Sequence, residues 1–88
     1  HIQIDDIVEK INALALVKNM HHVHIWKLNE DELHLEAEID FEKDISLSKF
    51  EEVLEEIESI LLSEYGINHI NIQPEFNKTD NKNIIVQD

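Results

Sequence analysis

The sequence predicts an α+β fold: a two-layer αββαβ sandwich in which a three-stranded mixed sheet carries two helices on one face. Three observations lead to this prediction. Two segments have apolar residues at helical spacing, three segments alternate apolar and polar residues, and each segment has one apolar side. Elements of this kind bury their apolar sides against one another, as helices do on a sheet. The 88 residues suffice for one core.

The first helix is predicted to begin at Asp5 or Asp6 and to fade near Lys18 and Asn19. Glu9 stands three residues after Asp6, which is the spacing of a capping box. The apolar stripe of this helix consists of Ile7, Val8, Ile11, Leu14 and Ala15.

A hairpin follows. From Met20 the apolar spacing changes to two, and after the polar turn "NEDE" a second alternating run extends from Leu33 to Ile39. The apolar residues of both strands must face the helices, which requires an odd offset between the two strands. This offset predicts a three-residue loop or a bulge. The predicted register pairs Ile25 with Leu35, His24 with Glu36, and Trp26 with His34.

The segment from Ser46 to Tyr65 is the clearest helix. Two alternative starts are predicted for this helix. One is Ser46 with a hydrophobic staple between Ile45 and Phe50, and the other is a capping box of Ser48 and Glu51. Gly66, the only glycine, predicts a left-handed C-terminal cap. The buried stripe consists of Phe50, Val53, Leu54, Ile57, Ile60 and Leu61.

A third strand is predicted from Ile67 to about Gln73, ended by Pro74. We expect a crossover that places it parallel to the first strand, which would then be central. Residues 77–88 are predicted to form a polar, flexible tail, although the apolar "IIV" within it could dock on the domain.

Composition excludes several classes of protein. The net charge of −13 would repel nucleic acid and anionic membranes. No cysteine is present, so disulfides and thiolate metal sites are excluded. The chain has no apolar run of about 18 residues and no signal peptide, and it starts at His1 with a helix close behind. We therefore expect a piece of a longer protein that does not itself insert into a membrane.

The sheet face without helices is predicted to carry histidines, acids and the only tryptophan. Neutral imidazoles and carboxylates suit a divalent metal ion, but they are also ordinary solvated strand residues. His21 has the parity of Val23, so a buried edge histidine and a ligand are both open, whereas His69 is expected to pack or cap. Trp26 is expected to be covered by a dimer partner or to lie over its own strand. The residues expected on this face are His22, His24, Trp26, His34, Glu36, Glu38 and Asn71.

Four stretches carry a family resemblance: "HHVHIW", "NEDE", "LHLEAEI" and "YGINHINIQPE". In this order and spacing they resemble the cytosolic C-terminal domain of cation diffusion facilitator transporters, over about positions 3 to 76. The resemblance implies a ferredoxin-like, metallochaperone-like fold, with residues 1–76 as the regulatory and dimerisation domain. It also implies a homodimer on the cytoplasmic side of the cell membrane, attached to the membrane-embedded portion of a transporter that exchanges zinc or a similar ion for protons. No enzymatic role is implied.

The resemblance also implies where metal ligands lie. His21 matches the family's opening histidine, and Glu75 stands at a closing position. Ala37 and Glu38 stand where other members have a histidine, and Gln73 is a poor ligand, so we expect a weaker or relocated site instead of a binuclear one. The expected ion is zinc, with cobalt, cadmium, manganese or iron as other candidates. The candidate ligands are His21, His22, His24, His34, Glu36, Glu38 and Glu75, and the candidate dimer contact is Trp26.

These features lead to one hypothesis and two alternatives. The chain is interpreted as a regulatory and dimerisation domain of a divalent-cation efflux antiporter, sensing metal through histidines and carboxylates. The alternatives are a purely structural dimerisation domain without specific metal binding, and a stand-alone αββαβ module that binds a metal or another small ligand.

Overall fold

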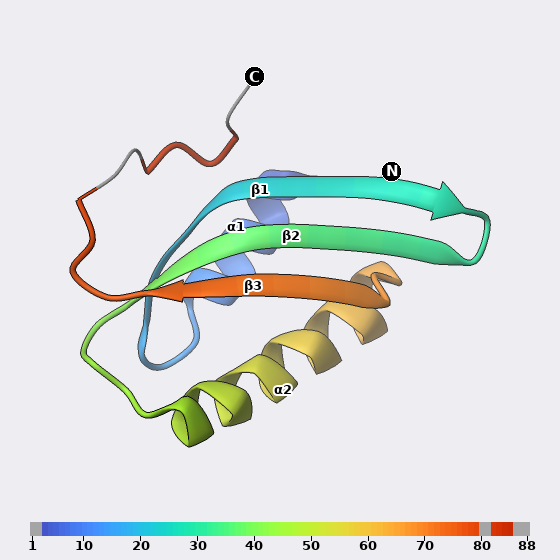
Figure 1. Cartoon of the computed structure of the whole chain (residues 1–88). Helices are drawn as coiled ribbons and strands as arrows, with labels where there is room; N and C mark the ends of the chain where they lie inside the picture. Colours follow the sequence, from blue (N-terminus) through green and yellow to red (C-terminus); the bar gives the residue numbers. More distant parts are fainter. Residues whose placement is uncertain (1–2, 80–81, 86–88) are drawn as a thin grey trace.

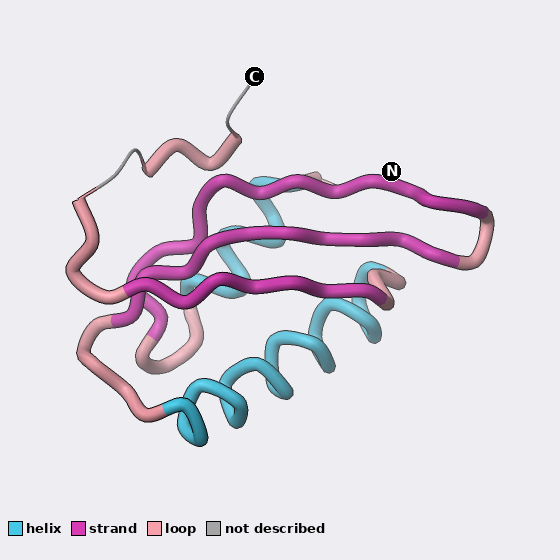
Figure 2. The backbone as a smooth tube through the Cα atoms, in the orientation of Figure 1, coloured by secondary structure: helices cyan, strands magenta, loops and turns pink. Residues whose placement is uncertain are grey.

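The computed structural model describes residues 3–79 and 82–85, and it has the predicted αββαβ order (Figure 1). Both helices lie on the same face of a three-stranded sheet (Figures 1 and 2). Among the described residues, no helix combines the length and apolar character needed to cross a membrane. The elements are α1 (Ile4–Asn12), β1 (Val17–Asn29), β2 (Glu32–Phe41), α2 (Leu47–Tyr65) and β3 (His69–Glu75).

The strand order is β1-β2-β3, so the prediction of a central first strand is wrong. The strand β2 is central, antiparallel to β1 and parallel to β3. The 19 residues of α2 span about 28 Å and carry the chain back along the ten-residue β2. The strand β3 therefore runs in the direction of β2, and the prediction that it is parallel to the first strand is also wrong. The helix therefore returns the chain to the beginning of β2, where His69 of β3 pairs with His34.

The helix α1 differs from its prediction at both ends. It begins after Gln3 without a side-chain cap, and Asp5 and Asp6 lie in its first turn. It ends at Asn12, well before the predicted Lys18. The side chain of Asn12 accepts a hydrogen bond from the Met20 N–H (2.8 Å), which ties the turn to β1. Leu16 turns the chain with a φ of 73°, and β1 starts directly after it.

The hairpin has the predicted register: Ile25 pairs with Leu35, His24 with Glu36, and Trp26 with His34. Of the two predicted ways to correct the offset, the structure uses the bulge. The register shifts between Lys27 and Asn29, and the connecting loop has only the two residues between Asn29 and Glu32.

The helix α2 has the predicted ends. The Ser46 hydroxyl accepts a hydrogen bond from the Lys49 N–H (3.1 Å), so Ser46 and not Ser48 is the N-cap. Gly66 has a φ of 71° and donates to the last carbonyls of the helix. Buried side chains of α2, α1 and the sheet form one core, which includes Ile7, Ile11, Leu35, Ile39, Ile57 and Leu61.

The strand β3 continues through Pro74 to Glu75, beyond its predicted end. This is possible because β3 is an edge strand, where a proline does not interrupt a ladder on its free side. Within the predicted tail, the carbonyls of Asn83 and Ile84 accept hydrogen bonds from the N–H groups of His22 and Val23. Residues 82–85 therefore lie beside β1, and Ile84 packs against the core.

Candidate metal centre

A bulge in β1 decides where His21 points. His21 pairs with Glu38, but between His21 and His24 the strand β1 has one residue more than the facing part of β2. His22 lies in this bulge with a φ of 51°. The extra residue places His21 on the open face together with His24, so the predicted parity with Val23 is wrong.

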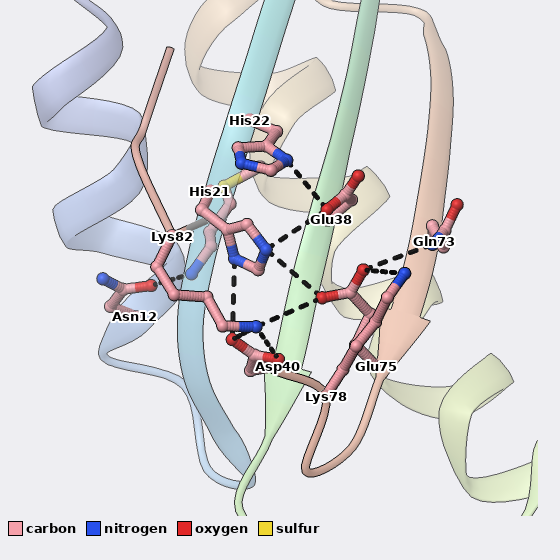
Figure 3. A network of polar contacts seen from close by, with 10 residues as sticks. Asn12, His21, His22, Glu38, Asp40, Gln73, Glu75, Lys78 and Lys82 are labelled. Carbon is pink, nitrogen blue, oxygen red and sulfur yellow. Dashed lines mark hydrogen bonds and ion pairs between the residues drawn. The ribbon is translucent and has the colours of Figure 1, made fainter. Parts of the chain in front are cut away.

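The imidazole of His21 lies among three carboxylates contributed by β2 and β3 (Figure 3). Its Nε2 is 3.2 Å from Glu38 Oε1 and 3.2 Å from Glu75 Oε1, and its Nδ1 is 3.6 Å from Asp40 Oδ2. The His21 side chain is fully buried, and Asp40 and Glu75 are each only 6% exposed. We call His21, Glu38, Asp40 and Glu75 the buried cluster.

Asp40 is a member of the buried cluster that the sequence prediction missed. It stands two residues after Glu38, so alternation along the strand gives both side chains the same face. The parallel register of β2 and β3 then pairs Asp40 with Glu75. Gln73, which the sequence predicts to be a poor ligand, donates a hydrogen bond from its Nε2 to Glu75 Oε2 (3.2 Å) and so positions that carboxylate.

Two lysines already neutralise part of the cluster's negative charge. Lys82 Nζ lies 3.0 Å from Asp40 and 3.5 Å from Glu75 Oε1, and Lys78 Nζ lies 3.5 Å from Glu75 Oε2 (Figure 3). Lys82 precedes the residues that pair with β1, so its ammonium group is held beside the carboxylates by the same segment. A cation that binds Asp40 and Glu75 has to compete with Lys82.

The donor atoms of the buried cluster fit a divalent cation. A tetrahedral zinc ion with bonds of about 2.0–2.1 Å holds its donors about 3.3 Å apart. The two contacts of His21 Nε2 with Glu38 and Glu75, both 3.2 Å, match this spacing. Nδ1, which is 3.6 Å from Asp40, lies on another side of the ring and cannot bind the same ion as Nε2. The donor atoms of His21, Asp40 and Glu75 all lie within 4.8 Å of one another. Imidazole nitrogen with carboxylate oxygen is a donor set that zinc and similar ions accept.

His22 extends this site toward the open face. Its Nδ1 is 2.9 Å from Glu38 Oε1, and its donor atom lies within 4.8 Å of those of His21 and Glu38. Next to it, a hollow of about 400 Å³ is lined by His22, His24, Glu36, Ala37, Glu38, Asn71 and Gln73. Glu38 thus belongs to the buried cluster and also forms a group of three possible donors with His21 and His22.

The remaining predicted residues do not join the buried cluster. His24 and Glu36 face each other across β1 and β2, and neither belongs to a group of three metal donors among the described residues. His34 lies at the other end of the sheet, between the rings of Trp26 and His69. Trp26 lies on the open face, as predicted, and is 42% exposed.

Comparison with known proteins now identifies the family. Residues 1–76 match the family model for the cation efflux protein, cytoplasmic domain. The chain belongs to this family. The match covers all five helices and strands and the whole buried cluster.

Two curated relatives agree with this assignment. The chain is 28% identical over 86 residues to a cadmium, cobalt and zinc/H(+)-K(+) antiporter of Bacillus subtilis, covering 98% of the chain and 27% of the relative. It is 34% identical over 79 residues to Zinc homeostasis factor 1 of Schizosaccharomyces pombe, covering 85% of the chain and 19% of the relative. The chain therefore spans about a quarter or less of these proteins.

The metal-bound C-terminal domain of the CzcD transporter from Cuprividus metallidurans superposes with a TM-score of 0.71 at 28% identity, covering 84% of this chain and 99% of that domain. The corresponding metal-bound domain from Thermotoga maritima gives 0.72 at 19% identity, covering 88% and 92%. The cation efflux cytoplasmic domain described here thus has the metallochaperone-like αββαβ fold that the sequence predicts.

Proposed function

We propose that this domain senses a divalent cation, zinc first, and forms the dimer contact on the cytoplasmic side of a metal efflux antiporter. The observation that carries the proposal is the position of His21, which is buried between carboxylates from two strands at spacings that suit metal ligands. The metal-bound structures of similar domains and the zinc-related names of the curated relatives support the choice of ligand.

Charge explains how metal would act on the domain. Glu38, Asp40 and Glu75 bring three negative charges close together, partly offset by Lys82. A bound divalent ion supplies two positive charges at this point. Mutual repulsion of the carboxylates then falls, and β2, β3 and the segment at residues 82–85 are held together at one place. If two copies of the domain close on each other, the closed form must bind metal more tightly for the ion to shift the population.

The open sheet face provides the proposed dimer contact. Trp26 is 42% exposed and Leu28 is 61% exposed, and both lie on β1. Apolar side chains of this size favour burial against a partner. We infer that a second copy covers part of this face and that closure of the pair biases the membrane-embedded portion toward transport.

One observation favours the alternative of a structural dimer without metal. The ammonium of Lys82 already occupies the side of the cluster where a cation would meet Asp40 and Glu75. In this alternative the lysine is the permanent counter-ion, and zinc adds nothing.

Calorimetric titration with zinc, combined with small-angle scattering, separates the two functions. We expect one saturable binding event at the buried cluster and a more compact dimer. The double variant His21→Ala, Glu75→Ala should lose both, whereas His24→Ala, a histidine on the same face outside the cluster, should keep both. Unchanged scattering at saturating zinc would overturn the switch, and unchanged zinc affinity in the double variant would overturn the site.

A further inference from the structure

We propose a second divalent-metal site at the opposite end of the open face, formed by Glu32, His34 and His69 and reported by Trp26. This site is distinct from the buried cluster and does not depend on the proposed sensing function. Neither Glu32 nor His69 was predicted as a ligand, because the strand order was needed to bring them together with His34.

Three rings form a row across the three strands. Trp26 of β1, His34 of β2 and His69 of β3 occupy the same register position. The rings of Trp26 and His34 are 5.2 Å apart with an angle of 23°, and those of His34 and His69 are 4.3 Å apart with an angle of 7°. Stacking therefore fixes both imidazoles in parallel orientations.

Both imidazoles direct the same nitrogen at one carboxylate oxygen. His34 Nε2 is 3.5 Å and His69 Nε2 is 3.4 Å from Glu32 Oε1. The three donor atoms lie within 4.8 Å of one another. The two distances to Glu32 Oε1 are close to the separation of about 3.3 Å between two donors of a tetrahedral zinc ion. Binding of one ion by both nitrogens requires the two stacked rings to tilt toward each other, because the in-plane lone pairs of parallel rings do not converge.

The hairpin holds Glu32 in place for this role. Asn29 Nδ2 donates a hydrogen bond to Glu32 Oε2 (2.9 Å), which leaves Oε1 facing the imidazoles. His34 Nε2 is buried, and its contact with Glu32 Oε1 at 3.5 Å is too long for a strong hydrogen bond. A positioned carboxylate and a buried nitrogen without a strong hydrogen bond suit a metal ligand set.

The chemistry of the site selects a class of ion. Two imidazole nitrogens and one carboxylate oxygen suit zinc, nickel and copper better than magnesium or calcium. His69 is about half exposed, so the remaining coordination positions are open to water and the ion can exchange. The strand partners of His21 and Trp26, Glu38 and His34, are four residues apart on β2, or roughly 13 Å, so one ion cannot bridge the two sites.

The test uses the indole N–H resonance of Trp26, which is the only tryptophan. Zinc is titrated into the chain and the resonance is followed by two-dimensional NMR. We expect a saturable shift. Glu32→Gln and His69→Ala should each lower the zinc affinity that the shift reports by at least about tenfold, because loss of a supporting contact already costs this much and loss of a ligand costs no less. His24→Ala and His21→Ala should leave the shift unchanged.

Each outcome decides the question. A shift that persists in His21→Ala and weakens in Glu32→Gln and His69→Ala supports the second site, whether or not the buried cluster binds zinc. A resonance that zinc does not move overturns the proposal, as does equal zinc affinity in Glu32→Gln. A shift that disappears in His21→Ala also overturns it, because Trp26 would then report the buried cluster or a dimer.

Discussion

The two ends of the open sheet face use the same residue types in opposite ways. At one end, His21 is fully buried among three carboxylates and a lysine from residues 82–85 lies against them. At the other end, two imidazoles and an indole are stacked in partial contact with solvent around the single carboxylate of Glu32. The first end is rich in negative charge and the second is rich in rings.

This difference teaches what each end requires. Buried carboxylates close to one another need a cation at all times, and Lys82 supplies one when metal is absent. The stacked rings carry no negative charge, so they need no counter-ion, and their edges reach water. We therefore expect metal to exchange against a lysine at the buried cluster and against water at the exposed end.

The largest expected effect comes from His21→Ala. Among the described histidines, His21 is the only one whose imidazole contacts Glu38, Asp40 and Glu75 together, and the variant removes it. Zinc affinity of the buried cluster should fall by about 100-fold or more, as measured by calorimetry. The NMR shift of the Trp26 indole should remain, and its loss would mean that the two ends are not independent.

A smaller effect of opposite sign is expected for Lys82→Met. Removing the competing ammonium should tighten zinc binding by about three- to tenfold, which corresponds to the 0.5–1.5 kcal/mol of a partly exposed ion pair. Without metal, the same variant should be less stable to urea than the wild type. Lys27→Met, which changes an exposed lysine of the hairpin, is the matched control. Weaker zinc binding in Lys82→Met would show that the lysine does not compete with the ion.

The contrast between the ends also explains what the sequence could predict. Alternation fixed the hairpin register, and Ser46 and Gly66 marked the ends of α2, because these features depend on neighbouring residues. The bulge at His22 has no local signal, since no glycine or proline marks it, and an error of one residue moved His21 to the wrong face.

Both clusters depend on the strand order. Pairing of β3 with β2 aligns Asp40 with Glu75 and His34 with His69. With the first strand in the centre, as the sequence suggested, these pairs would be separated. No single motif in the sequence marks the edge of the hairpin on which β3 adds.

The stacked row at the exposed end should contribute modestly to stability. Trp26→Ala removes the ring that covers His34 and should lower the free energy of unfolding by about 1 kcal/mol, the size of an aromatic pair interaction. Urea unfolding followed by circular dichroism measures this loss. Leu28→Ala, at another exposed position of β1, is the control. An equal loss in both variants would argue against a specific contribution of the stack.

The smallest expected effect is a pH dependence that belongs to Glu32. Its pKa is lowered below 4.5, chiefly by the hydrogen bond from Asn29 and then by His34. A carboxyl with a lowered pKa stabilises the fold above its unfolded-state pKa, and this contribution disappears as the pH falls through the folded-state value. The difference in Tm between wild type and Glu32→Gln should therefore shrink as the pH falls below about 4.5. Asn29→Ala removes the largest cause and should reduce the same pH dependence without removing the carboxyl. A Tm difference that does not change with pH would show that the hairpin does not hold Glu32 in its ionised form.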